Sequence, residues 1–526
     1  MLRDTRWPGL VLQPETRSIT PEELAKEVRS IYAGLTMVES KCIHVDRAQA
    51  ADKGSVLSGE HWTALVTLHR VLLHEHHDFM LASQHPSASD ALKRLATKYS
   101  MPARMWKHGV HSMLELLRQH LPGSLDFMMQ FIYIAYSMFG LLLETVPTFQ
   151  RTWLECLGDI ARYRMAIEEE DIRDRDNWAA TSRKWYTRVT RQEPDSGRLY
   201  HHLAILARPD RVRQLGLYTK SLICSVPFLS TRDSISTLFD FNENHAGLVD
   251  PTEAGFVKVH QLLFEHKFSE IEESARSFLD GLGERIQTQS TKWREIGAWM
   301  ASANIGALFD YGGNKSLLNY FKLAHHMSQL PTTAEVDPDC LPDDLKEATL
   351  FDVASADSLE KVSQLLGRTM GIATARSDDR NVLPHVYIVL VFLVSFAEAC
   401  RHARKHPQLF ATSFIQPGII LDHINWELLC ALLNELVESG TLTEYSSKFG
   451  PMDPANPCPL PEDFILQGTI YAAPYFPEGW FEQYQNDEEW PVEHASLRGV
   501  RIERILWLGG KLASVLPLRD HLTSSR

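Results

Sequence analysis

Residues 157–164 read LGDIARYR and residues 197–209 read GRLYHHLAILARP, and these two runs decide the fold that the sequence predicts. Between them, small and aromatic side chains recur at the spacing of the second helix of a tetratricopeptide repeat. The positions that fit this spacing are Ser182, Tyr186, Val189 and Pro194. A further helix follows from Leu215 to Cys224 and ends before Pro227. The pattern predicts two consecutive hairpins of antiparallel helices.

The first hairpin has a strongly acidic connection between its helices. Six acidic residues follow the first run: Glu168, Glu169, Glu170, Asp171, Asp174 and Asp176. Side chains with this much charge are rarely buried. We therefore expect a solvated loop that is about a dozen residues longer than the usual turn of such a repeat.

Helical periodicity also extends to both sides of these hairpins. Thr20, Pro21 and two acids mark the start of a first helix, because threonine caps a helix and proline suits its first turn. Apolar residues at helical spacing predict further helices over 59–83, 102–120 and 125–146. Strand patterns are nearly absent. The predicted fold class is therefore all-α, a tetratricopeptide-containing helical bundle followed by a stacked α-hairpin region.

Composition sets the predicted domains and their environment. The 526 residues suffice for two or three domains, and we assign a flexible lead to 1–19, a first domain to 20–241 and a C-terminal helical-hairpin domain to 255–518. The seven cysteines are scattered and form no CxxC pair, which favours a reducing compartment, the nucleus or the cytoplasm. The longest apolar run, 386–397, is too short to cross a bilayer and predicts a buried helix. Residues 1–14 contain no secretory leader pattern, so we expect no export.

The charge of the chain disfavours binding of nucleic acid over a broad surface. The net charge is −14 and the isoelectric point is near 5.9, whereas lysine and arginine supply most of the affinity for phosphate backbones. Such binding would need a local basic patch. The best one in the C-terminal half, HARKH at 402–406, is more typical of a helix C-terminal cap, where cations interact favourably with the helix dipole.

Together with YTKSL at 218–222, the two opening runs resemble the Est-one (ever shorter telomeres) family, whose members act in telomerase function and in nonsense-mediated mRNA decay. The stretches PLPED at 459–463 and RIERILWLG at 501–509 resemble the end of the helical region in fungal members. The resemblance implies an adaptor that is located in the nucleus. Shuttling between the nucleus and the cytoplasm is the alternative. The resemblance also implies that the N-terminal domain is similar to a 14-3-3 fold.

The 14-3-3 resemblance implies an anion-binding site. In that fold a lysine on one helix and an arginine–tyrosine pair on another hold a phosphoserine. Arg162 and Tyr163 match the pair, and His111 stands at the position of the lysine, with Lys107 one turn earlier. His201 matches an asparagine of the relatives. Arg164 is a further candidate ligand, since phosphate needs two or three charge-assisted donors.

Two observations weigh against this site. An unperturbed imidazole such as that of His111 is mostly neutral at pH 7 and cannot replace an ammonium group. Arg162 can also pair with Asp159 or Glu155 inside the bundle as a structural link. Both interpretations of Arg162, structural pairing and anion binding, remain open on the sequence alone.

Metal binding and catalysis find little support in the sequence. His74, His77 and Asp78 lie three or four residues apart on a predicted helix, but the zincin pattern is broken and we favour helix capping and surface hydrogen bonding. There is no glycine-rich phosphate loop and no GxSxG motif. We expect no catalytic residue, no metal and no cofactor.

Three functions remain as hypotheses. The first is a non-catalytic adaptor in telomerase regulation and telomere maintenance, bound to a protein partner in phosphorylated form. The second is a decay factor that recruits a phosphorylated helicase. The third is direct binding of single-stranded telomeric DNA or RNA through a local basic patch. No membrane partner is expected.

Overall fold

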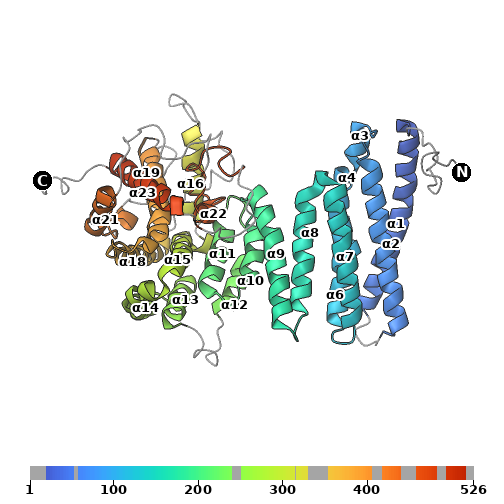
Figure 1. The fold of residues 1–526 in the computed structure, drawn as a ribbon, viewed down its shortest axis with the longest axis horizontal. Coiled ribbons are helices and arrows are strands. Elements are labelled where there is room, and N and C mark those ends of the chain that lie inside the picture. Colours follow the sequence, from blue (N-terminus) through green and yellow to red (C-terminus); the bar gives the residue numbers. More distant parts are fainter. Residues whose placement is uncertain are drawn as a thin grey trace, which may run out of the picture. The chain divides into compact units, whose positions relative to one another are not determined.

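The computed structural model describes residues 19–51, 57–239, 250–313, 315–329, 354–405, 418–439, 458–482, 493 and 495–516. Within these ranges the chain is helical and its extended backbone is limited to isolated bridges (Figure 1). The predicted all-α fold is therefore confirmed. The chain divides into two compact units, 1–185 and 186–526. The domains predicted at 20–241 and 255–518 have a different boundary and remain a prediction, and the predicted lead 1–19 lies outside the described residues except for Ile19.

Unit 1 is a bundle in which α1, α2, α7 and α8 lie side by side (Figure 1). Its first helix starts with a capping box, because Thr20 and Glu23 each accept a hydrogen bond from the other's backbone N–H group. The elements of this unit are α1 (Pro21–Ala51), α2 (Gly59–Ser83), α3 (Asp90–Lys93), α4 (Leu95–Lys98), α5 (Met101–Arg104), η1 (Met105–His111), α6 (Ser112–Gln119), α7 (Leu125–Thr145), η2 (Pro147–Phe149), α8 (Gln150–Ala166) and the first part of α9 (Ile172–Gln192).

The acidic connection between α8 and α9 is shorter than predicted. Asp174 and Asp176 belong to the first turns of α9 rather than to a loop. The side chain of Asp171 accepts hydrogen bonds from the backbone N–H groups of Arg173 at 2.8 Å and Asp174 at 3.4 Å, so it caps the helix. Acidic side chains stabilise a helix N-terminus through its dipole, which explains why the charged run continues the helix instead of extending the loop.

Unit 2 contains the second predicted hairpin, α10 (Gly197–Leu206) and α11 (Arg211–Ile223). Gly197 is required there, because a Cβ atom would lie 2.2 Å from the carbonyl oxygen of Ser221. The later elements are α12 (Thr231–Phe239), α13 (Pro251–Phe264), α14 (Phe268–Gln289), η4 (Ser290–Lys292), α15 (Trp293–Leu308), η5 (Asp310–Gly312), α16 (Lys315–Gln329), α18 (Ala354–Thr374), η8 (Arg380–Val382), α19 (Leu383–Lys405), α20 (Gly418–Leu421), α21 (Trp426–Ser439), α22 (Asp463–Leu466) and α23 (Ala495–Val515).

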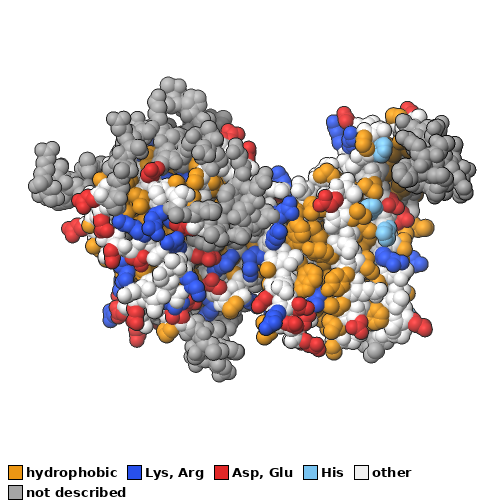
Figure 2. Space-filling model, in the orientation of Figure 1, with side chains coloured by type: hydrophobic (Ala, Val, Ile, Leu, Met, Phe, Trp, Pro, Cys, Tyr) orange, Lys and Arg blue, Asp and Glu red, His pale blue; other side chains and the backbone are white. Residues whose placement is uncertain are grey.

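Helix α19 is the centre of unit 2, in contact with α15, α16, α18 and α23. Both α19 and α7 are long and apolar enough to cross a membrane by length and composition alone. Within the fold, however, 94% of the most apolar part of α19 is buried, which confirms the predicted buried helix at 386–397. Helix α7 has one face in the core of unit 1 and leaves Tyr133 and Leu141 exposed. Hydrophobic side chains also gather on the surface of unit 1 in Figure 2.

The two C-terminal stretches that carried the resemblance meet in unit 2. Arg504 of α23 donates a hydrogen bond to Asp463 at 2.5 Å, and Arg501 donates to Glu462. All four side chains are almost completely buried. The hydroxyl of Tyr387, on α19, donates to Asp463 at 2.8 Å. We call these two ion pairs the arginine clasp, because they join α23 to the segment around α22 and to the core helix.

Two histidines of α2, His69 and His76, lie in the core of unit 1, whereas His74 is exposed. The ring nitrogens of His69 lie 3.0 Å from Asp46 and 3.1 Å from the carbonyl oxygen of Gly109. His76 is fully buried, and within the described part of the chain its ring has no hydrogen-bond partner. The surface hydrogen bonding predicted for His74, His77 and Asp78 is present between His77 Nδ1 and Asp78 Oδ1, which lie 3.2 Å apart. Burial lowers the pKa of His76 to about 4, despite the opposing effect of Glu39.

We expect His76 to make unit 1 sensitive to acid. Its pKa is below the unfolded value, so the unfolded chain binds a proton first and stability falls as the pH drops from 7 towards 4. In urea unfolding followed by circular dichroism, the wild type should lose about 2 kcal/mol more than His76→Met between pH 7 and pH 5. His44→Met, at an exposed site on α1, is the control. Equal pH dependence of wild type and His76→Met would contradict the expectation.

Removing one member of the arginine clasp should destabilise unit 2 strongly. Arg504→Met leaves the carboxylate of Asp463 buried without its guanidinium partner, and we expect a loss of about 3–5 kcal/mol in the free energy of unfolding. The double variant Arg504→Met, Asp463→Leu removes both charges and should lose less than the sum of the two single variants. Additive losses in chemical denaturation would show that the two residues are not coupled.

Candidate functional site

Five of the six predicted anion ligands lie in unit 1, on η1 and α8, whereas His201 lies on α10 of unit 2. Helix α8 packs against α7, which leaves its Arg162–Tyr163 pair only partly buried. Element η1 is a π-helical turn, and the backbone N–H of Ser112 bonds to the carbonyl of Lys107, five residues earlier. Such turns widen a helix locally and are frequent at functional sites. Lys107 and His111 are therefore offset relative to a regular α-helix.

A carboxylate from α6 lies against the tyrosine of the pair. Tyr163 donates a hydrogen bond from its hydroxyl to Glu115 at 2.7 Å. Arg118 donates to the same carboxylate at 2.6 Å. The pKa of Glu115 is lowered, chiefly because Arg118 donates hydrogen bonds to it and further because of Tyr163 and the charge of His111. Burial and the bond to Glu115 raise the pKa of Tyr163, so its hydroxyl keeps its proton and acts as a donor.

The arginine of the pair is also held by a carboxylate. Arg162 donates to Asp159, one turn earlier on α8, at 3.1 Å. Its guanidinium carbon lies 5.7 Å from the centre of the Tyr163 ring. The structural pairing of Arg162 with Asp159, one of the two interpretations left open by the sequence, is therefore present. The anion-binding interpretation stays a prediction.

The remaining predicted ligands are distributed over several places. Lys107 and His111 are exposed on η1, and the ring of His111 lies 6.3 Å from that of Trp106. Arg164 is buried on α8, pairs with Glu168 at 2.8 Å and packs over the ring of Trp178. The structure thus brings His111, Arg162 and Tyr163 to the surroundings of Glu115, while Arg164 has its contacts elsewhere.

His201 belongs to unit 2, on α10. Its Nδ1 lies 3.1 Å from the hydroxyl of Thr231, and its ring contacts those of Tyr218 and Phe228. Arg104, another cation near the predicted lysine position, donates two hydrogen bonds to the buried carboxylate of Glu39. Both side chains have structural partners in the bundle cores.

The sequence analysis missed Glu115 and Arg118. Glu115 and Arg118 lie four and seven residues after His111, and this spacing would have placed all three on one side of a regular helix. We call His111, Glu115, Arg118, Asp159, Arg162 and Tyr163 the Glu115 cluster. Its two arginines and two carboxylates cancel in formal charge, so an incoming anion must take donors away from Glu115 or Asp159.

Other chemistry finds no site among the described residues. No group of three or more histidine, cysteine, aspartate or glutamate side chains is arranged to hold a metal ion there. Four of the cysteines in these ranges are buried: Cys42, Cys156, Cys224 and Cys400. Burial raises the pKa of the Cys400 thiol to about 11, which keeps it in the unreactive protonated form at pH 7.

No family model matches the chain. Three curated proteins resemble parts of it. EST/SMG-like protein 2 of Saccharomyces cerevisiae is 23% identical over 164 residues, 31% of this chain and 13% of that protein. Telomerase-binding protein EST1A of Danio rerio is 33% identical over 97 residues, 18% of this chain and 6% of that protein. Nonsense-mediated mRNA decay factor SMG7 of Arabidopsis thaliana is 36% identical over 88 residues, 16% of this chain and 8% of that protein.

The fold resembles one chain in a crystal structure of Est1 and Cdc13. The superposition has a TM-score of 0.56 and covers 91% of this chain and 96% of that one, at 8% sequence identity. The resemblance to the Est-one family is confirmed. The Est-one-type fold extends over most of the chain, whereas each match to a curated relative spans less than a sixth of that relative.

We expect Glu115 to compete with an anion that binds at this cluster. Glu115→Gln removes the charge but keeps a hydrogen-bond acceptor, so Tyr163 and Arg118 become available to a phosphate. The affinity for a phosphoserine peptide library with random flanking residues should rise about three- to tenfold, within the range of one charge-assisted hydrogen bond. Fluorescence anisotropy measures the change, and Glu60→Gln, in the first turn of α2, is the control. A fall in affinity would show that the carboxylate helps to hold the ligand.

Proposed function

We propose that the chain is a non-catalytic adaptor in telomerase regulation and telomere maintenance, located in the nucleus. The observation that carries this proposal is the Est-one-type fold over 91% of the chain, together with relatives named for telomerase binding and for mRNA decay. Stacked helices with buried, protonated thiols and neutral buried histidines suit docking of another macromolecule better than chemistry.

We assign the docking of a phosphorylated partner segment to the Glu115 cluster. Tyr163 and Arg118 already hold one anionic side chain, which shows that their donors suit a carboxylate-sized group. Arg162 adds a second guanidinium on the neighbouring helix, and guanidinium groups bind phosphate in a bidentate manner. Lys107 and His111 are both exposed on η1. The family resemblance implies that this element supplies a cation to the site.

A role in mRNA decay is the alternative, favoured by the 36% identity to SMG7 over 88 residues. In that case the phosphorylated partner would be a helicase of the decay complex. Both adaptor roles use the same cluster, so the chemistry of the site does not separate them. Co-purification of either telomerase RNA or a decay helicase with the chain from its own cells would separate the two roles.

Arg162→Glu should lower the affinity for the phosphoserine peptide library by at least about 1.5 kcal/mol, the contribution of one charged hydrogen bond. The reason is that the variant replaces a donor with a like charge beside the phosphate. Arg70→Glu, at an exposed site on α2, is the matched control. Circular dichroism should show an unchanged fold. Equal affinity of the wild type for phosphorylated and plain peptides would contradict the assigned phosphate site.

A salt titration separates peptide docking from direct binding of nucleic acid. Affinity for a single-stranded oligonucleotide that is held through several phosphates should fall by orders of magnitude between 50 and 200 mM salt. A phosphopeptide that contacts two or three cations should lose much less. Tight oligonucleotide binding with a steep salt dependence would replace the adaptor proposal with the nucleic-acid one.

A further inference from the structure

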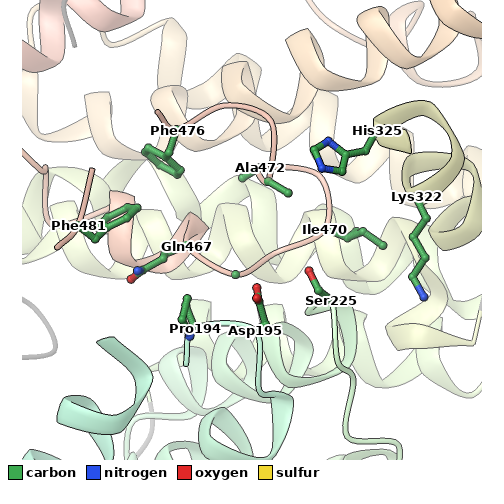
Figure 3. Close-up of a pocket in the computed structure, with 12 residues that line it drawn as sticks. Pro194, Asp195, Ser225, Lys322, His325, Gln467, Ile470, Ala472, Phe476 and Phe481 are labelled. Atoms are coloured by element: carbon green, nitrogen blue, oxygen red, sulfur yellow. The ribbon is translucent and has the colours of Figure 1, made fainter. Parts of the chain in front are cut away.

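Unit 2 contains a cavity of about 530 Å³ that the function proposed above does not use (Figure 3). Its walls come from α16, from the turn at Pro194–Asp195, from Ser225 and from the segment 467–481. Cavities of roughly 300–1,000 Å³ are typical of sites that bury a ligand. We call it the α16 cavity.

One side of the α16 cavity is apolar. Ile470 and Ala472 are buried in its wall, and Phe476 and Phe481 are half-buried at its edge. The two phenylalanine rings meet edge to face with centres 4.9 Å apart. Figure 3 shows both rings on one side of the cavity, with Lys322 on the opposite side. An apolar group that enters the cavity and packs against the two rings would be removed from water.

The polar side chains around the α16 cavity have unused hydrogen-bonding capacity. Within the described ranges, the Lys322 ammonium forms no ion pair, and the side-chain amide of Gln467 forms no hydrogen bond although the residue is 7% exposed. The Ser225 hydroxyl and the Asp195 carboxylate, also at the cavity, form no side-chain hydrogen bond there. A ligand that enters the cavity could bond to the amide of Gln467, which both donates and accepts.

The backbone holds these groups in place. Gly468 has φ +79°, and a Cβ atom there would lie 1.9 Å from the carbonyl oxygen of Pro194, so only glycine fits. Its own carbonyl accepts a hydrogen bond from the backbone of Ser225 at 3.2 Å. Ile470 donates to the carbonyl of Ile223 at 3.1 Å. The site is therefore formed before a ligand arrives, which reduces the entropy cost of binding.

We propose that the α16 cavity binds an extended segment of a partner protein that carries one large apolar side chain and one carboxylate. The apolar side chain would pack against Phe476 and Phe481, and the carboxylate would pair with Lys322. The side-chain amide of Gln467 can donate to and accept from one peptide group, which an extended backbone offers. The proposal rests on the adaptor function, since it gives that adaptor a second docking site.

Charge distinguishes this ligand from nucleic acid. Lys322 and His325 are the basic residues among the described cavity lining, and burial lowers the pKa of His325, which leaves its ring neutral at pH 7. Asp195 places a carboxylate at the same cavity. Binding of a sugar–phosphate backbone requires several cations along the surface, whereas binding of a single carboxylate requires one cation. The lining therefore favours a peptide with a single acidic side chain.

The test uses the full chain and a defined set of peptides. Each fluorescein-labelled ten-residue peptide contains one Phe, Trp or Leu and one Glu, one to four residues apart in a Gly/Ser background, and its twins carry Gln or Lys in place of Glu. Fluorescence anisotropy should show that at least one spacing binds, with at least tenfold lower affinity for its Gln twin. A fluorescein-labelled oligothymidine is measured in parallel.

Two variants locate the binding. Lys322→Glu should lower the affinity for the Glu peptide at least tenfold and should bind the Lys twin at least tenfold better than the wild type does. Ala473→Trp, at an exposed lining position, should block the cavity and abolish binding of both. Lys292→Glu, at an exposed site of unit 2 outside the cavity, is the matched control. Thermal melting followed by circular dichroism establishes that each variant is folded.

The proposal is overturned if no peptide binds, if folded Lys322→Glu and Ala473→Trp bind like the wild type, or if only oligothymidine binding depends on Lys322. Arg162→Glu should leave the Glu-peptide affinity unchanged, because Arg162 belongs to unit 1. Loss of phosphopeptide binding at the Glu115 cluster and loss of peptide binding at the α16 cavity are therefore separate results. Failure of one site leaves the result for the other intact.

Discussion

The arginine clasp is the constraint on which the organisation of unit 2 depends. Helix α19 is surrounded by apolar side chains. Apolar contacts hold the neighbouring helices against α19 but do not fix their position along its axis. Burying a charge costs several kcal/mol unless it is paired, so Arg501 and Arg504 can be buried only where Glu462 and Asp463 meet them. We interpret the clasp as the interaction that selects one register for α23. The segment that lines the α16 cavity begins four residues after Asp463, so the shape of that cavity depends on the same pairs.

The sequence predicted helices well because helical periodicity is a local property. The helix predicted over 59–83 has those bounds in the structure, where Ser58 caps it. The predictions failed where tertiary contacts or helix capping determine the type or the bounds of a helix. The π-helical turn at 105–111 has no local signal, since the buried contact between His69 and the carbonyl of Gly109 is formed across 40 residues. Asp174 was assigned to a loop because burial alone was considered, although acids also stabilise a helix start.

The candidate site was predictable in part for the same reason. Arg162 and Tyr163 are adjacent in sequence and carry a family resemblance, so they could be named from the sequence. Glu115 could not be assigned to Tyr163, since 48 residues separate them and only the packing of α6 near α8 brings them together. The α16 cavity lies beyond sequence reasoning for a stronger reason. Its walls come from positions as distant as 194, 225, 322 and 481, and each of these residues is ordinary by itself.

The internal pairing of the Glu115 cluster determines which anions the proposed phosphate site would favour. A monovalent carboxylate that enters the cluster merely replaces one carboxylate with another, and the donors of Tyr163 and Arg118 gain little from the exchange. A phosphate group carries about −1.5 to −2 charges at pH 7 and three acceptor oxygens, so it can accept from Arg162 as well as from the other two donors. In the proposed phosphate site, the internal carboxylate would therefore favour a dianion over a monoanion. A neutral cluster of this kind would distinguish a phosphorylated segment from the aspartate and glutamate side chains that are far more abundant on protein surfaces, and a cluster with an unpaired lysine would do so less well.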